Sequence, residues 1–371
     1  MLIVDGHLDL AWNALQWNRD LLCSVHTTRT RELEIAGPGR GQGTVALPEL
    51  RRGRVGLCFA TLLARSTGRA KLDIDYSSPI QAYGIAQGQL AYYRALEEQG
   101  HVRIITDAAC LNRHIAEWDA YDALPDAQQD NSPPIGLVIC MESADPVLSP
   151  AQVRQWWEGG VRIIGPAHYG PGRYAGGTGT EQGLTSEGCE LLVEMERLGI
   201  ILDLTHLSDQ SFWQALERFG ATVLASHNNC RTLVAHQRQF SDDQLRAIVA
   251  RNGVIGVAFD AWMLQPGWVV GVTTNERVRL STVIDHIDYV CQLSGNCRHA
   301  ALGTDLDGGF GQEQSPRDLD TIADLGKVQG LLAERGYSDE DSRAILHGNW
   351  LRLLRRAWSG EESDGGNLTS K

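Results

Sequence analysis

The chain has 371 residues, of which 43% are hydrophobic and 21% are charged, and its formal net charge at pH 7 is −13. This composition is ordinary for a globular protein with enough chain to bury a large core. The acidic excess comes without a basic run that could follow a phosphate backbone, so we expect no nucleic-acid partner.

Short apolar runs recur along the chain, and each is followed by a helical pattern. Runs this short and this continuously apolar are typical of strands that are buried on both faces. They are the segments 2–9, 55–64, 135–142, 161–168, 200–206, 221–227, 253–260 and 300–307. Eight strands that alternate with helices predict a (β/α)8 TIM barrel, with a doubly wound open sheet as the alternative.

Several helices between these runs have recognisable starts. Ser208 can cap a helix that runs to Phe219, Ser241 and Gln244 form a capping-box pattern, and Ser338 can cap a last amphipathic helix. A long helix is expected at about 79–99, and "HVRIIT" at 101–106 is a possible extra strand.

The domain organisation follows from these elements. We expect residues 1–358 to form a single catalytic barrel with an insertion-like region at about 66–134. Residues 359–371 are polar and rich in Gly and Ser, so we expect a disordered tail there.

Most of the apolar runs end in a side chain that can bind a metal or transfer a proton. These side chains are His7, Asp9, Glu142, His168, His206, His227 and Asp305. His7 and Asp9 should project from the same side of the first strand, because side chains alternate with a period of two. The C-terminal ends of barrel strands meet at one face, where all these groups would converge. Burying them without partners would cost several kcal/mol each, a cost that a bound metal cluster offsets.

The donor atoms of this set are nitrogen and oxygen, which suits Zn²⁺ and also Mn²⁺, Co²⁺ or Fe²⁺. Three histidines and two carboxylates are too many for one four-coordinate ion with an open position. They suit two ions that share a bridging carboxylate, lower the pKa of a bound water and polarise a carbonyl. The remaining histidines are predicted to be surface or structural residues: His26, His101, His114, His236, His286, His299 and His347.

The segments "DGHLDL", "THLSD", "ASHNNCR" and "GTDLDGG", together with the Glu that ends the third strand, resemble the membrane (renal) dipeptidase family of binuclear-metal amidohydrolases. The C-terminal "HGNWLRLL" resembles that family's Gly-x-Asn-x-Leu-Arg ending, and the similarity extends to about residue 357. The resemblance implies hydrolysis of a dipeptide by a hydroxide that bridges two divalent metal ions, with zinc as the foremost candidate. It also implies tolerance of D-residues at the C-terminal position, and a homodimer.

The same resemblance implies the ligands of the two metal ions. His7 and Asp9 would bind the first ion, and His206 and His227 would bind the second. Glu142 would bridge both ions, where many relatives use a carboxylated lysine.

The resemblance also implies roles for residues around the metals. His168 would contact the scissile carbonyl and stabilise the oxyanion, and Asp305 would carry a proton from the water to the leaving amine. Arg238 would hold the substrate carboxylate, although Arg231 lies nearby and could do the same work. Asp307 could in principle replace Asp305 as the base, but the resemblance favours Asp305, with Asp307 supporting the loop.

Two loops depart from the family pattern, "AHYGPGRYAGGTGT" after the fourth run and "FDAWMLQPGW" after the seventh. Both should line the substrate pocket, so they bear on specificity more than on metal binding. An alternative function is therefore an amidohydrolase that acts on N-acyl amino acids, lactones or lactams. A more remote alternative is a barrel without catalytic activity.

The cellular location is predicted from two kinds of segment, a transmembrane segment and a leader. No apolar stretch approaches the ~20 residues that span a bilayer, and strand-like sequence begins at Leu2 without a leader pattern, so we expect a cytoplasmic protein with no membrane partner. The eight cysteines are scattered, without a Cys-x-x-Cys pair, and we expect reduced thiols. Cys58, Cys140 and Cys230 should fill the core.

Overall fold

The computed structural model describes residues 1–68, 74–124 and 132–359. It contains all the predicted strands: β1 Ile3–Leu8, β2 Val55–Leu63, β4 Ile135–Glu142, β5 Val161–Gly165, β6 Ile201–Asp203, β7 Val223–Leu224, β8 Ile255–Val257 and β9 Ala300–Leu302. β1, β2, β4, β5, β6 and β7 follow one another in a parallel sheet, and β8 pairs in parallel with β9.

The two sheets join into a closed ring. A parallel bridge between Ala225 and Ile255 links β7 to β8. On the other side, the Asp305 backbone N–H donates to the His7 carbonyl at 3.3 Å. The backbone N–H and hydroxyl of Thr304 donate to the Asp5 carboxylate at 2.8 and 2.6 Å, which fastens β9 to β1. The predicted (β/α)8 barrel is confirmed, and the open sheet is excluded because the first and last strands are neighbours.

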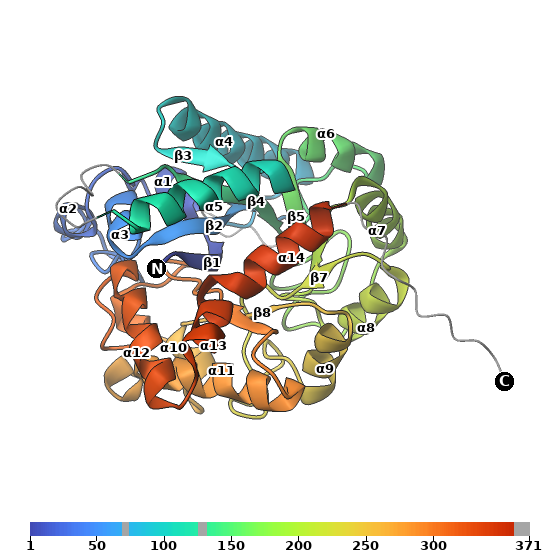
Figure 1. Ribbon diagram of the computed structural model, residues 1–371. Helices are drawn as coiled ribbons and strands as arrows, with labels where there is room; N and C mark the ends of the chain where they lie inside the picture. Colours follow the sequence, from blue (N-terminus) through green and yellow to red (C-terminus); the bar gives the residue numbers. More distant parts are fainter. Residues whose placement is uncertain (69–73, 125–131, 360–371) are drawn as a thin grey trace.

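Helices surround the strands (Figure 1). Their bounds are α1 Leu10–Leu15, α2 Val25–Arg31, α3 Leu47–Arg52, α4 Pro79–Glu98, α5 Ala108–Asp122, α6 Val153–Glu158, α7 Ser186–Leu198, α8 Asp209–Arg218, α9 Asp242–Ala250, α10 Ala261–Leu264, α11 Leu280–Ser294, α12 Lys327–Glu334, α13 Asp339–Arg343 and α14 Asn349–Trp358.

The predicted helix starts are observed, with one difference. Ser208 caps α8, and Ser241 with Gln244 forms the capping box of α9. Ser338 caps the short α13 rather than one long last helix. The π-helical turn Ala344–Gly348 lies between α13 and α14. Its wider hydrogen-bonding pattern divides the predicted helix in two.

The insertion-like region lies between β2 and β4 and contains α4, α5 and the predicted extra strand, β3 Val102–Ile104. β3 pairs with the first residues of β4, from Ile135 on, while β5 pairs with the last ones, up to Glu142. The additional strand therefore does not separate neighbouring strands of the ring. Residues 69–73 and 125–131 of this region, and the predicted tail beyond residue 359, lie outside the described residues.

Two groups of buried apolar side chains hold the barrel. One fills its interior and includes Val4, Phe59 and Val138. Trp350 of α14 closes the end opposite the strands' C-termini: its ring lies 4.9 Å from that of Phe59, and its indole donates to the Leu302 carbonyl at 2.8 Å. Figure 1 shows α14 crossing in front of the strands. The interior is therefore a packed base, open toward the other end.

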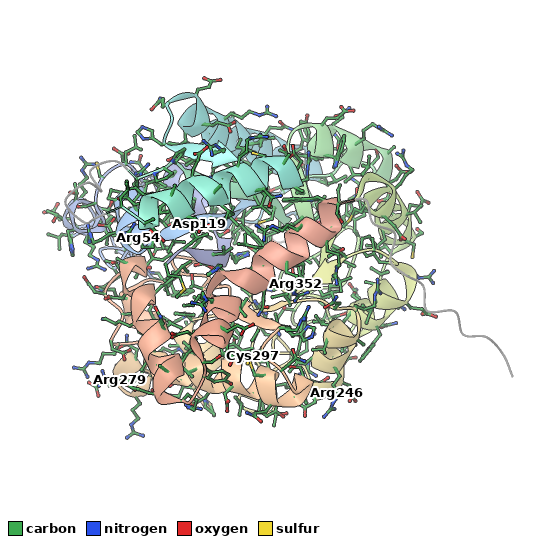
Figure 2. The ribbon with its side chains drawn as sticks, in the orientation of Figure 1. Arg54, Asp119, Arg246, Arg279, Cys297 and Arg352 are labelled. Atoms are coloured by element: carbon green, nitrogen blue, oxygen red, sulfur yellow. The ribbon has the colours of Figure 1, made fainter. Side chains whose placement is uncertain are left out.

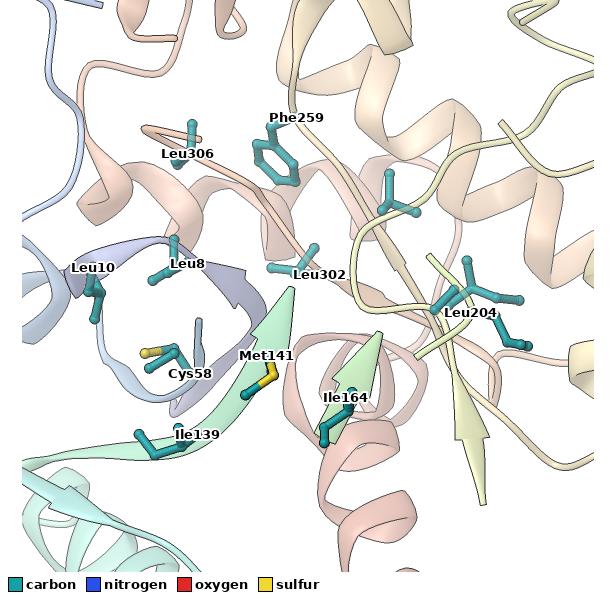
Figure 3. Packing of buried hydrophobic residues seen from close by; sticks show 14 of the residues in the cluster. Leu8, Leu10, Cys58, Ile139, Met141, Ile164, Leu204, Phe259, Leu302 and Leu306 are labelled. Carbon is teal, nitrogen blue, oxygen red and sulfur yellow. The ribbon is translucent and has the colours of Figure 1, made fainter. Parts of the chain in front are cut away.

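The second group fills the space between the strands and the helices. Figure 3 shows part of it, with Ile139 and Met141 of β4 and Ile164 of β5. Alternate residues of the same strands thus face two apolar layers, which explains why the strands read as continuous apolar runs. Cys58, Cys140 and Cys230 are buried free thiols, as predicted.

Charged side chains lie on the outside of the helical layer. Figure 2 shows Arg246 of α9 and Arg279, which precedes α11, at the edge of the molecule. Among the described helices, none combines the length and the apolar character that a bilayer-spanning segment needs. In barrels of this type the active site lies at the C-terminal end of the strands.

Candidate metal centre

The polar residues that follow the strands meet at the C-terminal end of the barrel. Their ligand atoms form three overlapping groups, and within each group the atoms lie within 4.8 Å of one another. The groups are His7, Asp9 and Glu142; Glu142, His206 and His227; and His7, His227 and Asp305. The structure thus brings together every residue that the sequence proposed as a ligand.

The first strand delivers its two residues differently from the prediction. β1 ends at Leu8, so Asp9 lies beyond the strand, at the position that precedes α1. The pairing of β1 with β2 shifts register between Asp5 and Leu8, which breaks the simple alternation of side chains. His7 and Asp9 reach the same group because of this irregularity and the turn into α1, and not because they alternate along a strand.

Glu142 lies at the centre of the site. Its Oε1 is 3.2 Å from His206 Nε2 and 3.4 Å from His227 Nε2, while its Oε2 is 3.5 Å from His7 Nε2. The two oxygens of one carboxylate therefore face two different sets of ligand atoms. This is the arrangement that a carboxylate shared by two cations requires.

The spacing of these atoms fits a metal ion. Two ligands at ordinary Zn–N or Zn–O bond lengths in a tetrahedral site lie about 3.3 Å from each other. The Nε2 atoms of His206 and His227 are 3.2 Å apart, close to that value. His7 Nε2 is buried and has no hydrogen-bond partner among the described residues, which is costly unless a cation accepts its lone pair. The residues present therefore fit divalent metal ions.

Hydroxyl groups lie behind the histidines of the three groups. The Ser226 hydroxyl lies 2.9 Å from His227 Nδ1 and 3.4 Å from His7 Nδ1. The Thr178 hydroxyl lies 3.1 Å from His206 Nδ1 and donates to the His206 carbonyl at 3.2 Å. A hydroxyl oxygen can accept from each Nδ1–H, which leaves every Nε2 lone pair facing the site.

Burial dominates the electrostatics of the site. It lowers the pKa of the His206 and His227 imidazoles well below the usual value, so both are neutral and competent to bind a metal. Burial also raises the pKa of Asp9 to about 7 and that of Asp305 well above its usual range. Burial opposes ionisation of Glu142 too, but its electrostatic interactions with the surrounding imidazoles, those of His168 and His7 foremost, hold its pKa well below the usual value. Bound cations would favour the ionised form of every carboxylate here.

The backbone is strained around the site. His206 and Asp305 have φ of 67° and 58°, and Ser143, next to Glu142, has φ of 71°. Left-handed backbone is unfavourable for residues other than glycine and persists only where the surroundings enforce it. The surrounding barrel therefore enforces these backbone conformations at the residues of the site.

The structure separates the two candidate bases. Asp305 lines a cavity above the site, with Oδ1 3.8 Å from His7 Nε2. Asp307 points elsewhere: its carboxylate accepts from the Thr44 backbone N–H at 2.7 Å and lies 3.2 Å from the Arg19 guanidinium. Asp307 thus fastens a loop, and of the two carboxylates it is Asp305 that lines the cavity.

The cavity has a volume of about 720 Å³, enough for a small peptide-like molecule. It also separates the two candidate arginines, because Arg238 is among its lining residues and Arg231 is not. Arg238 is 2% exposed and donates to the Asn228 side chain at 2.6 Å and to the His227 carbonyl at 2.8 Å. Arg231 forms a two-bond ion pair with Asp209.

The sequence did not single out several residues of the cavity wall. Arg65 lies 3.0 Å from His168 Nδ1, and Asp260 is a buried carboxylate whose pKa burial raises to about 7. Trp262 lines the same wall. Asp260 and Trp262 fall in the loop after β8 that the sequence marked as a pocket wall, so the region was identified but not its residues. For Arg65, no sequence signal was available.

Comparison with known proteins agrees with this geometry. Residues 1–363 match the family model described as membrane dipeptidase, peptidase family M19. A protein encoded in the pqqA 5′ region of Klebsiella pneumoniae is 31% identical over 56% of this chain and 76% of its own length. An uncharacterised dipeptidase of Schizosaccharomyces pombe is 31% identical over 56% of this chain, and the match spans about half of that protein, 49%.

A solved structure shares the fold. It is a metallopeptidase from Rhodobacter sphaeroides, determined with a phosphinate mimic of the dipeptide L-Ala-D-Ala. It superposes with a TM-score of 0.76 and 22% identity, covering 96% of this chain and 99% of that one. At this level of identity, the similarity shows that the two chains share a fold.

Proposed function

The chain belongs to the membrane dipeptidase family of metallopeptidases, peptidase family M19, and from this premise we propose that it hydrolyses dipeptides with two metal ions held by the strand-end residues. The observation that supports this most is the division of the Glu142 oxygens, one toward His206 and His227 and the other toward His7. A site for one ion does not need a carboxylate with both oxygens engaged on opposite sides.

We assign the ligands as the resemblance implies. His7 and Asp9 would hold one ion, His206 and His227 would hold the other, and Glu142 would bridge them. Zinc is the proposed metal, because the set consists of imidazoles and carboxylates, and the His206 and His227 nitrogens lie at a spacing typical of tetrahedral Zn²⁺. When bound, the two ions would supply a bridging hydroxide at neutral pH and polarise the scissile carbonyl.

The chain's own residues then manage charge and protons. His168 Nε2, 3.6 Å from Glu142 Oε1, donates a hydrogen bond to the carbonyl oxygen as it becomes an oxyanion. Asp305 accepts a proton from the attacking water and delivers it to the leaving amine, because it borders both the cavity and the His7 side of the site.

Arg238 is our candidate for binding the C-terminal carboxylate of the dipeptide, because it lines the cavity and its guanidinium is buried there, held by Asn228 and the His227 carbonyl. We also propose that the enzyme accepts D-residues at the C-terminal position. The Rhodobacter sphaeroides structure, which was solved with a mimic of L-Ala-D-Ala, supports this part of the proposal for a related fold.

Three further expectations from the sequence remain proposals. They are that residues 1–358 act as one catalytic domain, that the protein is a homodimer, and that it is cytoplasmic. Size-exclusion chromatography with light scattering would test the second directly: a mass near twice the 40.7 kDa of the chain is the expected result.

A substrate panel tests the function. Zinc-loaded protein is assayed with L-L and L-D dipeptides, with the matching N-acetyl amino acids, and with a lactone and a lactam. We expect turnover of dipeptides, with kcat/KM above that of every other class. No turnover of any dipeptide would contradict the proposal, and preferred turnover of an N-acyl amino acid, lactone or lactam would replace it with the alternative amidohydrolase function.

A further inference from the structure

Four histidines surround Glu142, and their Nδ1 atoms meet different chemical groups. The three assigned as ligands have a hydroxyl there, from Ser226 or Thr178. Because a hydroxyl can accept a hydrogen bond, these imidazoles can carry their proton on Nδ1 and offer the Nε2 lone pair to a metal.

The fourth histidine has a partner of the opposite kind. His168 Nδ1 lies 3.0 Å from Nη1 of Arg65. A guanidinium has five N–H donors and no acceptor, so Nδ1 must be the acceptor in this contact. A neutral His168 therefore carries its proton on Nε2, the atom that points toward Glu142. The hydrogen-bond partner thus makes His168 a donor where its neighbours are ligands.

Arg65 is held in place by an ion pair and by its backbone. Its Nε lies 3.2 Å from Asp75 Oδ2, a contact without hydrogen-bond geometry, and its side chain is only 12% exposed. Asp75 in turn accepts from the Thr67 backbone N–H at 2.9 Å and from the Thr67 hydroxyl at 2.6 Å. The Arg65 backbone pairs with the same segment, donating to the Ile74 carbonyl and accepting from Tyr76.

The loop after β2 is also fastened to the rest of the rim. The Ser66 backbone N–H donates to Asp145 Oδ2 at 2.8 Å, and the other oxygen of Asp145 accepts from the Arg173 backbone N–H at 2.9 Å. The loops after β2, β4 and β5 are therefore tied together, and His168 follows β5. Arg65 and His168 keep a fixed relation because their loops share this carboxylate.

We propose that Arg65 is a positioning residue for the reaction, which fixes His168 as its Nε2–H tautomer so that this proton faces the oxyanion of the substrate. The inference rests on the proposed function, because the oxyanion role of His168 belongs to it. It has a second consequence: with Nε2 protonated, His168 has no lone pair for a metal, so the ions stay with the hydroxyl-backed histidines.

Two substitutions separate this role from simple packing. Arg65→Gln puts an amide oxygen where it can accept from Nδ1–H, so both tautomers become possible. Arg65→Lys keeps a group that can only donate, so the Nε2–H tautomer should persist. If Arg65 only supported packing, Arg65→Gln and Arg65→Lys would differ in their stability but not in the tautomer of His168. Arg173→Gln, at an arginine of the same rim that pairs with Glu187, is the matched control.

The first readout needs no activity. Metal-free full-length protein with ¹⁵N-labelled histidine gives separate ring-nitrogen signals that report which nitrogen is protonated, and His168→Ala identifies the His168 signals. We expect protonated Nε2 in the wild type, in Arg65→Lys and in Arg173→Gln, and a mixture of tautomers in Arg65→Gln. An unchanged tautomer in Arg65→Gln would overturn the inference.

The second readout is turnover of the zinc-loaded variants with a dipeptide. Arg65→Gln should lower kcat by about 10- to 100-fold with little change in KM, because a misdirected oxyanion donor weakens the transition state and not substrate binding. Arg65→Lys should recover much of the loss. A raised KM with unchanged kcat would show instead that Arg65 binds substrate.

His168→Ala distinguishes the two levels of the argument. If it loses activity while Arg65→Gln keeps full kcat, the inference about Arg65 fails and the proposed role of His168 stands. If His168→Ala itself keeps full kcat, the oxyanion role fails, and the inference fails with it.

Discussion

The floor and the wall of the cavity are built in different ways. The floor consists of residues at the ends of several strands, with Glu142 in the middle and with His7, His206 and His227 buried. The wall consists of loop residues such as Arg65, Arg238 and Asp260, whose positions depend on contacts between loops. The difference teaches that the fold itself assembles the candidate metal site, whereas the shape of the cavity wall depends on which loops are attached to each other.

The largest effect is expected from the floor, at Glu142. Glu142→Gln removes the charge that the two ligand groups share, so we expect loss of both metal ions and activity at background. Metal content after dialysis and kcat/KM measure this. Glu49→Gln, at a buried glutamate of α3 that accepts from the Val25 backbone N–H, is the control and should keep its metal. Two retained equivalents of metal in Glu142→Gln would refute the bridging role.

The next largest effect on turnover is expected at Asp305, and Asp307 provides the comparison. Asp305→Asn should lower kcat by about 10²- to 10⁴-fold with the metal retained, because a proton carrier is lost but the assigned ligands remain. Asp307→Asn should do the reverse, lowering the midpoint of thermal unfolding while the folded protein keeps its kcat. Full kcat in Asp305→Asn would assign the proton transfer to another group.

A smaller effect is expected just beneath the floor. Ser226→Ala removes the hydroxyl behind His7 and His227, and such partners of metal-binding histidines typically contribute about 10- to 100-fold in affinity. Competition titration with a zinc chelator measures the loss. Ser211→Ala, a buried serine that bonds the Gln182 carbonyl instead, should leave zinc affinity unchanged. Equal affinity in both variants would mean that the hydroxyl does not orient the imidazoles.

In the wall, at Asp260, we expect an effect on the pH dependence of stability rather than on turnover. Burial raises its folded pKa from 3.8 to about 7, so the folded state holds a proton that the unfolded state releases. The stability that this provides is present below about pH 4 and is lost as pH rises toward 7. Asp260→Asn has no proton to lose, so its unfolding free energy relative to the wild type should rise by about 1 kcal/mol per pH unit across that window. Chemical denaturation at several pH values measures it, and a difference independent of pH would contradict the assignment.

The floor could be predicted from the sequence because its residues follow apolar runs. A histidine or acid at the end of a buried strand must lie at one end of a barrel, whatever the loops do. The exception is instructive: Asp9 reaches the site through a register shift and a turn, which alternation along a strand does not describe. The sequence correctly predicted that His7 and Asp9 lie in the same site, but strand alternation is not what brings them together.

The wall could be located but not resolved. The loop "FDAWMLQPGW" was marked as pocket-lining, yet Asp260 was not distinguished from its neighbours, because exposure within a loop depends on partners such as Gln314. Arg65 was missed because its importance comes from His168, which is 103 positions away. The choice between Arg238 and Arg231, and between Asp305 and Asp307, likewise needed the partners that the folded chain supplies.

The central claim is that the strand ends hold two ions on either side of Glu142. An anomalous difference map from crystals of the zinc-loaded protein, collected at the zinc absorption edge, tests it most directly. We predict two peaks, one bordered by His7, Asp9 and Glu142 and the other by Glu142, His206 and His227. A single peak, or peaks away from Glu142, would contradict it.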